Sequence, residues 1–243
     1  MEKYKEIWKA CQGQQHIQKL RVSAWRITDQ DKMTIRKLVD SEDDYQILAD
    51  LIEQVRPSEE LRLKPFRAPY LHRGSRFAHR SEPSLWYGSL DLDAAFAEAA
   101  FYRLLFLSHS TTLNVIEISL VVFSVFIETQ QGIDLTQSPF NRYKNIISSP
   151  VSYAASQSLG SAMRLAGVMA FLYYCARTHE QKHNVALFTP QGFSNKEESA
   201  LQLWQCIAND KGVSFIRQDS LSNVVKVYPA AYFMIDGQII PPQ

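Results

Sequence analysis

The most hydrophobic window of the chain is the ten-residue run ISLVVFSVFI at residues 118–127. A membrane-spanning helix needs roughly 20 apolar residues, so this run is too short to cross a bilayer. The wider segment 115–129 is rich in β-branched and aromatic residues, which favour an extended backbone. We therefore expect a buried core strand here, then a turn at Gln131-Gly132 and a returning strand at 133–135.

Further elements follow from hydrophobic spacing and turn signals. Short strands are expected at residues 20–27, 85–87, 167–177, 184–189, 224–228 and 231–235. Helices are expected at 41–56, from the N-cap Asp91 to about residue 107, at 149–164 and at 197–208, with a polar connector at 57–69. Strands and helices mix without a βαβ rhythm, and no G-x-G-x-x-G or Walker A motif occurs, so we expect an α+β fold.

The length of 243 residues and the hydrophobic content of 46% are sufficient for one substantial core. We found no internal repeat or low-complexity tract. We therefore expect one compact domain, in which an N-terminal extension (residues 1–66, a strand plus the helix 41–56) packs on a core of residues 67–243. The formal net charge of +1 gives no global field that would attract nucleic acid or an anionic membrane.

The three cysteines, Cys11, Cys175 and Cys206, lie far apart without C-x-x-C spacing. This pattern predicts reduced thiols rather than disulfides or a zinc site. The first residues are mixed in charge and lack the apolar run of a signal peptide. Together these features predict a cytoplasmic protein with no membrane segment, no metal and no direct contact with nucleic acid.

Residues 73–103 carry the strongest functional pattern: a basic loop with a glycine, a short aromatic segment and then a helix. Within this stretch Arg76, Tyr87 and Glu98 follow one another at equal intervals of eleven residues. This interval is not a period of a helix or a strand, so three elements carry the three side chains. The pattern favours a common site, and the alternative is three unrelated surface residues.

Glu98 lies on an unusually apolar stretch of helix. At about 100° per residue it shares a face with five other residues: Ala94, Ala95, Phe101, Tyr102 and Leu105. A carboxylate in such surroundings is at least half buried, where an unpaired charge is costly. Two interpretations follow: a structural ion pair with Arg103 or Arg76, or an acid that stabilises positive charge developing on a sugar or orients a nucleophile.

The basic loop concentrates positive charge beside a glycine through Arg73, Arg76, Arg80 and two histidines. A guanidinium fork matches phosphate geometry, so the loop is either a phosphate site or a solvated basic loop. Tyr87 is either a core aromatic or a side chain that stacks on a flat or cationic ring.

Cys175 is followed by His179 and His183. No orienting acid or oxyanion loop accompanies the cysteine, so the sequence does not favour a Cys/His nucleophile. The two histidines have the helical spacing of metal ligands, but they fall in a polar loop without an accompanying glutamate motif. We therefore assign no metal to them.

Three segments, in this order, resemble the RES-domain family, which is named for its Arg, Glu and Ser residues. They are RGSRFAHRSEPSLWYGSLDLDAAFAEAAFYR, SYAASQSLGSAMRLAGVMAFLYYCAR and NVALFTP. The upstream segments IWKACQGQQHIQ and LVDSEDDYQILADLIE are similar to the longer subtype of that family. The resemblance covers most of the chain, and it implies an ADP-ribosyltransferase-like mixed β-sheet core with flanking helices and a cleft.

Carried over by position, Arg76 matches the family arginine that holds the phosphates of NAD. Tyr87 matches the tyrosine on the nicotinamide side, and Glu98 matches the family glutamate. Cys175 stands where the family serine is expected, in Tyr173-Tyr174-Cys175-Ala176-Arg177 instead of Tyr-x-Ser-Ala-Arg. Three more residues complete the implied NAD-binding set: Arg26, Arg73 and Asn184.

The resemblance implies a bacterial toxin that degrades NAD, as a phosphorylase or glycohydrolase releasing nicotinamide, within the glycosyltransferases. NAD is then a substrate, inorganic phosphate a co-substrate, and an antitoxin with a helical DNA-binding domain the partner. Two alternatives stay open: a mono-ADP-ribosyltransferase acting on a protein, and a degenerate RES domain that binds NAD or an antitoxin without turnover. The cysteine at position 175, in place of the family serine, is the feature that supports the degenerate domain. The sequence does not decide whether the protein forms a homo-oligomer.

Overall fold

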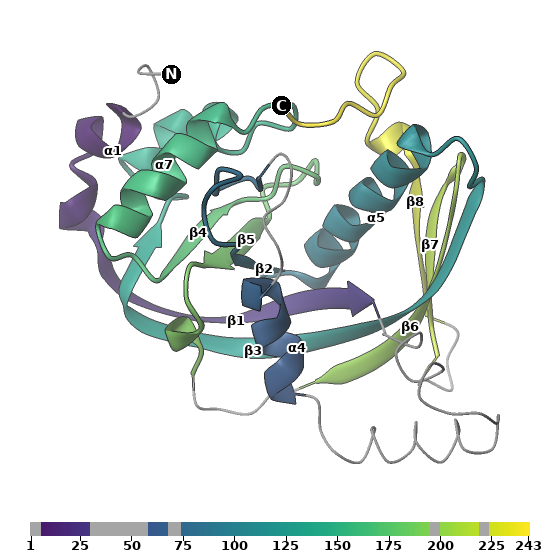
Figure 1. Ribbon diagram of the computed structural model, residues 1–243, viewed down its shortest axis with the longest axis horizontal. Coiled ribbons are helices and arrows are strands. Elements are labelled where there is room, and N and C mark those ends of the chain that lie inside the picture. The colour runs from purple at the N-terminus through teal and green to yellow at the C-terminus, as the bar shows by residue number, and fades with distance from the viewer. Residues whose placement is uncertain (1–5, 30–57, 68–73, 195–199, 219–223) are drawn as a thin grey trace.

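The computed structural model describes residues 6–29, 58–67, 74–194, 200–218 and 224–243 (Figure 1). The helix expected at 41–56 and the candidate residue Arg73 lie outside these ranges. No helix of the described residues is both long and apolar enough to cross a membrane.

The helices are α1 (Glu6–Ala10), α4 (Ser58–Arg67), α5 (Leu92–His109), α6 (Lys144–Ile147) and α7 (Ala154–Leu165). Short 3-10 helices are η2 (Gly13–His16), η3 (Phe140–Tyr143), η4 (Pro190–Gly192) and η5 (Ala230–Tyr232). The strands are β1 (Gln18–Asp29), β2 (Trp86–Ser89), β3 (Val115–Asp134), β4 (Ala170–Tyr174), β5 (His183–Leu187), β6 (Leu201–Asn209), β7 (Gly212–Arg217) and β8 (Val225–Pro229). The fold is therefore α+β, as the sequence predicts.

The described strands form one eight-stranded mixed sheet in the order β1-β2-β5-β4-β3-β6-β7-β8. The long strand β3 pairs on one edge with β1, from Leu120 opposite Asp29 to Gly132 opposite Gln18. Its other edge is shared, since β6 pairs with residues 115–123 and β4, in parallel, with residues 132–134. The sheet therefore divides at β3 into two arms, β4-β5-β2 and β6-β7-β8.

Helices cover these arms separately (Figure 1). The arm β4-β5-β2 packs against α7 through Phe171 and Met163, which belong to one buried cluster. The arm β6-β7-β8 packs against α5, where the ring of Phe96 lies 4.6 Å from Trp204 and 4.7 Å from Phe215. The two helices flank the short strands β2, β4 and β5, and this arrangement positions the candidate site.

Local signals identified several elements correctly. β1, β2, β4, β5 and β8 lie where strands are expected, and α5 begins after its predicted N-cap, Asp91. The carboxylate of Asp91 accepts hydrogen bonds from the backbone N–H groups of Asp93 and Ala94, at 2.8 and 3.2 Å. This cap fixes the start of the helix that carries Glu98.

The turn expected at Gln131-Gly132 is wrong, because β3 continues through both residues to Asp134. Gly132 pairs with Gln18 on one edge and with Ala170 on the other. A Cβ at this position would stand 2.3 Å from the Cβ of Leu20. The glycine therefore permits close approach of β1 rather than a turn.

The helix expected at 197–208 is also wrong where the structure describes it, since residues 201–209 form β6. Its buried side chains Trp204, Cys206 and Ala208 alternate with less buried ones, which is the period of a strand. β6 lies between β3 and β7, and the sequence analysis did not assign β7. Pairing on both edges therefore outweighs the helical pattern.

Three other boundaries differ from expectation. The segment 57–69 contains helix α4 instead of a connector, with Pro65 inside the helix. Helix α7 begins at Ala154 instead of residue 149, because Ser149 Oγ accepts hydrogen bonds from the N–H groups of Val151 and Ser152 and holds a turn there. Residues 231–235 hold part of η5 and an isolated bridge instead of a strand.

Candidate active site

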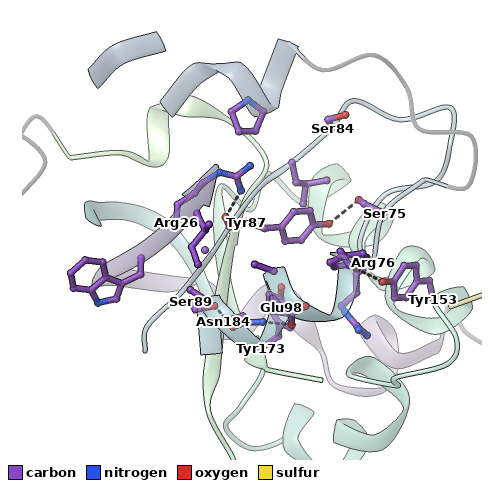
Figure 2. A pocket seen from close by; sticks show the side chains of 18 of the residues that line it. Arg26, Ser75, Arg76, Ser84, Tyr87, Ser89, Glu98, Tyr153, Tyr173 and Asn184 are labelled. Atoms are coloured by element: carbon purple, nitrogen blue, oxygen red, sulfur yellow. Dashed lines mark hydrogen bonds between the residues drawn. The ribbon is translucent and has the colours of Figure 1, made fainter. Parts of the chain in front are cut away.

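A cavity of about 480 Å³ is lined by residues of β1, β2 and α5 and of the loop that carries Arg76 (Figure 2). Its size is within the range of roughly 300–1,000 Å³ that is usual for small-molecule sites. Five residues singled out from the sequence line it: Arg26, Arg76, Tyr87, Glu98 and Asn184. The equally spaced trio thus comes together from a loop, from β2 and from α5.

Strand register builds the floor of this cavity. Ser89 of β2 pairs with Asn184 of β5, which in turn pairs with Tyr173 of β4. Because paired residues project to the same face of a sheet, these three side chains form one row across the strands. Tyr87, two residues before Ser89, projects to the same face.

Glu98 enters the cavity from α5, and its Oε1 atom accepts two hydrogen bonds. The amide Nδ2 of Asn184 donates at 2.9 Å and the thiol of Cys175 at 3.3 Å. Oε2 accepts none from the part of the chain that the structure describes. The carboxylate is therefore held by one oxygen, while the other is available to a ligand.

The structure contradicts the ion-pair interpretation of Glu98. Arg103 pairs with Asp29, and Arg76 donates instead to the backbone carbonyl of Ser149, at 2.7 Å. Within the described ranges no cationic side chain forms an ion pair with Glu98. A partly buried carboxylate without a direct ion pair is costly to maintain, which is typical of functional sites.

Cys175 donates a hydrogen bond to Glu98 but is not among the residues that line the cavity. Its side chain is 7% exposed. Burial and the neighbouring carboxylate of Glu98 raise the pKa of this thiol to about 12. Cys175 is therefore a protonated hydrogen-bond donor and not a thiolate nucleophile.

Arg76 is buried, with 6% of its surface exposed, and its guanidinium lies 4.7 Å from the ring centre of Tyr153. Burial lowers the pKa of Arg76, but the opposing effect of Tyr153 and Glu98 leaves that pKa raised overall. Its Nη2 atom is buried without a hydrogen-bond partner. A permanently charged donor with an unused N–H group is suited to an anion.

Tyr87 links the floor of the cavity to the loop that carries Arg76. Its hydroxyl shares a 2.8 Å hydrogen bond with Ser75 Oγ and accepts another from the backbone N–H of Phe77, at 3.2 Å. Burial raises the pKa of Tyr87 to about 12. The ring can face a ligand, and the hydroxyl fixes the position of the loop.

Arg26 closes the side of the cavity next to β1. Its Nη1 atom donates to the backbone carbonyl of Tyr87, and its guanidinium lies 5.4 Å from the ring centre of Trp86. Burial lowers the pKa of Arg26 to about 10. Its Nε atom is buried without a partner, so Arg26 is a second candidate donor to an anionic ligand.

Sequence reasoning identified Tyr87 but assigned no role in the site to three other tyrosines that line the cavity. Tyr102 and Tyr153 share a 2.6 Å hydrogen bond between their hydroxyls, and both line the cavity with Tyr173. Tyr173 could have been found by extending the strand alternation of β4, whereas no local signal marks Tyr153, which precedes α7. Of the basic loop, Arg80 is exposed and does not line the cavity, so Arg76 is the only arginine of the loop's described part that is placed as a ligand-binding residue would be.

A family model for the RES domain matches residues 51–207 of the chain. The chain belongs to the RES-domain family. No curated protein matches this RES domain. Among solved structures, one chain of the M. tuberculosis MbcT-MbcA toxin-antitoxin complex is similar to it, with a TM-score of 0.48 and 11% sequence identity, over 79% of this chain and 90% of that chain.

Proposed function

We propose that this RES domain cleaves the bond between nicotinamide and ribose in NAD. The observation that carries the proposal is the carboxylate of Glu98, which is oriented by Asn184 and Cys175, lines a cavity and has no ion-pair partner among the described residues. Membership of the RES-domain family, whose glutamate Glu98 matches, supports the same substrate.

The proposed chemistry is dissociative. The electron pair of the glycosidic bond moves to the ring nitrogen, nicotinamide leaves as a neutral molecule, and positive charge develops on the ribose. Glu98 stabilises this charge through Oε2, because a fixed carboxylate lowers the energy of a cationic transition state. Arg76 and Arg26 hold the pyrophosphate, and Tyr87 lies against the departing ring.

Phosphate or water then captures the ribosyl cation. Capture by phosphate gives a sugar phosphate, whereas capture by water gives ADP-ribose and releases a proton. We favour phosphate, since NAD phosphorylase activity is implied by the family resemblance. The proposal includes the ADP-ribosyltransferase-like assignment of the fold, which the divided mixed sheet and the cavity beside β1, β2 and α5 support.

The second candidate, a degenerate domain that binds NAD without turnover, rests on the cysteine at the family serine position. The contact between Cys175 and Glu98 argues against it, since the thiol still supplies a donor to the carboxylate.

One assay separates the candidate activities. Purified protein is incubated with NAD in the presence and absence of phosphate, and nicotinamide is quantified. Release that requires phosphate supports a phosphorylase, release in both buffers a hydrolase, and labelling of protein by radioactive NAD a transferase. NAD binding without any release favours the degenerate domain.

We further propose that the protein acts in the bacterial cytoplasm as the toxin of a toxin-antitoxin pair. Unrestrained cleavage in the cytoplasm would deplete the cell of NAD. A partner that covers the cavity would then be required for viability. Expression of the wild-type chain alone is expected to stop growth and lower cellular NAD, and co-expression of an antitoxin encoded beside it is expected to restore both. Growth that continues with unchanged NAD would contradict a toxin.

A further inference from the structure

Two buried polar side chains connect β2 and β5 to Glu98, as Figure 2 shows. Ser89 and Asn184 occupy one register pair of the two strands and are 3% and 1% exposed. Ser89 Oγ donates to Asn184 Oδ1 at 2.7 Å, and Asn184 Nδ2 donates to Glu98 Oε1 at 2.9 Å. These contacts form a chain of hydrogen bonds from the sheet to the carboxylate.

The carboxylate of Glu98 sets which way the Asn184 amide faces, because a carboxylate only accepts hydrogen bonds. The NH₂ group therefore points to Glu98 and Oδ1 points to Ser89, whose hydroxyl donates to Oδ1 and holds the amide in place. The opposite orientation would set a carbonyl oxygen against a carboxylate oxygen, with no proton between them. Ser89 therefore influences Glu98 without touching it.

The same contacts give the two oxygens of Glu98 different surroundings. Oε1 accepts from Asn184 and from Cys175, which lie on β5 and just after β4, whereas Oε2 accepts from no described residue. Two donors on one oxygen fix the rotation of the carboxylate about its last bond. Oε2 is thereby the oxygen left to meet the ribose.

We propose that Asn184 and Ser89 are positioning residues for Glu98, in an inference that rests on the proposed NAD cleavage. Their role is to hold Oε1 so that Oε2 faces the scissile bond. This role differs from the direct NAD binding expected for Asn184 from the sequence, because the Asn184 amide is already engaged at both ends. Removing these hydrogen bonds lowers the rate of bond cleavage and leaves the affinity for NAD largely intact.

The first test is Asn184→Ala, with kcat from nicotinamide release and the dissociation constant of NAD from calorimetry. We expect kcat to fall about 10- to 100-fold, as is usual when a hydrogen bond to a charged group or a supporting contact is lost, and the dissociation constant to change by less than about threefold. Weaker NAD binding at an unchanged kcat would overturn the inference and return Asn184 to the NAD-binding set.

The variant Asn184→Asp keeps the shape of the side chain and tests the need for a donor. The introduced carboxyl group can still accept from Ser89, but it donates to Glu98 only when it carries a proton. Two adjacent carboxyl groups retain one proton to a higher pH than either would alone. The activity of this variant relative to wild type is therefore expected to rise as the pH falls from about 8 to about 5.5. A ratio that does not depend on pH would contradict the role as donor.

A double-mutant cycle isolates Ser89. Ser89→Ala alone is expected to lower kcat by about three- to tenfold, because Oδ1 of Asn184 loses the hydrogen bond that holds the amide in place. Added to Asn184→Ala, the same substitution is expected to cost no further activity, since Ser89 acts only through Asn184. Independent, multiplicative losses would mean that Ser89 acts by another route.

Crystal structures of the wild type and of Asn184→Ala separate this inference from the proposed function. If the wild type releases no nicotinamide, the proposed function fails, but the geometry can still be examined. In the variant the Glu98 carboxylate is expected to leave its wild-type rotamer or to become mobile. A carboxylate that stays in place in the folded variant would overturn the positioning role.

Discussion

The thiol of Cys175 and the carboxylate of Glu98 form a hydrogen bond, with 3.3 Å between Sγ and Oε1, across 77 residues of sequence. The contact joins the end of β4 to the second turn of α5. Because burial and Glu98 raise the pKa of the thiol to about 12, Cys175 remains a donor at any pH near neutrality. If Cys175 stands at the family serine position, as the sequence predicts, the change keeps a donor to Glu98 and exchanges oxygen for sulfur.

Substitutions at Cys175 measure the importance of this donor. Cys175→Ser is expected to retain or raise kcat for nicotinamide release, since a hydroxyl is the stronger donor. Cys175→Ala leaves Asn184 as the remaining donor to Glu98, and kcat is expected to fall about three- to tenfold. Cys206→Ala, which removes a buried thiol in the other arm of the sheet, is the control and is expected to leave kcat unchanged. Full activity in Cys175→Ala would show that the contact is dispensable.

Arg76 is expected to bind an anion, and Arg80 four residues later is the matched control. Arg76→Lys retains the charge but loses the planar fork that stacks on Tyr153 while it donates to Ser149. We expect KM for NAD to rise about tenfold or more, which corresponds to at least one lost charged hydrogen bond. The exposed Arg80→Ala is expected to leave kinetics unchanged. Equal effects of the two substitutions would point to general electrostatic attraction instead of a built site.

Gly160 of α7 allows this helix to lie directly against the loop that carries Arg76. A Cβ at this position would stand 2.1 Å from the carbonyl oxygen of Phe77. Gly160→Ala is expected to lower the free energy of unfolding by about 1–3 kcal/mol through overpacking and to raise KM for NAD by displacing the loop. Urea unfolding and steady-state kinetics measure the two effects, with Ser158→Ala on the same helix as the control. If Gly160→Ala had the same free energy of unfolding and the same KM as wild type, the helix would be free to shift away from the loop.

The fold is also expected to lose stability in alkali through the partly buried Tyr87. The pKa of Tyr87 is raised by burial to about 12, above the value of about 10 in an unfolded chain. The raised pKa of Tyr87 contributes about 3 kcal/mol to the free energy of unfolding. This contribution is complete below about pH 10 and is lost as the pH rises through about 12. Urea unfolding across this range is expected to show a smaller decrease for Tyr87→Phe than for wild type. Equal decreases would exclude Tyr87 as a source of the pH dependence.

Local sequence patterns were sufficient for the elements that carry the site. The cap at Asp91, the apolar face around Glu98 and the short strand at Trp86 each depend on neighbours within a few residues. The family resemblance added the roles proposed for Arg76, Tyr87 and Glu98. The structure brings these three to one cavity, and their functions remain predictions.

The features that sequence reasoning missed depend on contacts between distant segments. Gly132 resembles a turn residue until β1 and β4 are seen on its two sides, and Trp204 lies in a helical pattern until β3 and β7 pair with β6. The link from Ser89 through Asn184 requires the register of β2 and β5, which no local signal encodes. Propensity is a weak guide where pairing across the chain determines the backbone.

The most direct test of the account compares nicotinamide release from NAD by the wild type and by Glu98→Gln. Because Glu98 forms no ion pair among the described residues, the substitution is expected to leave the thermal unfolding midpoint within a few degrees of wild type. The wild type is expected to release nicotinamide, and the variant to release it at least about 100-fold more slowly, as is usual when an electrostatic stabiliser of the transition state is removed. Equal release by the two proteins, or an unfolded variant whose folded fraction keeps full activity, would contradict the central role of Glu98.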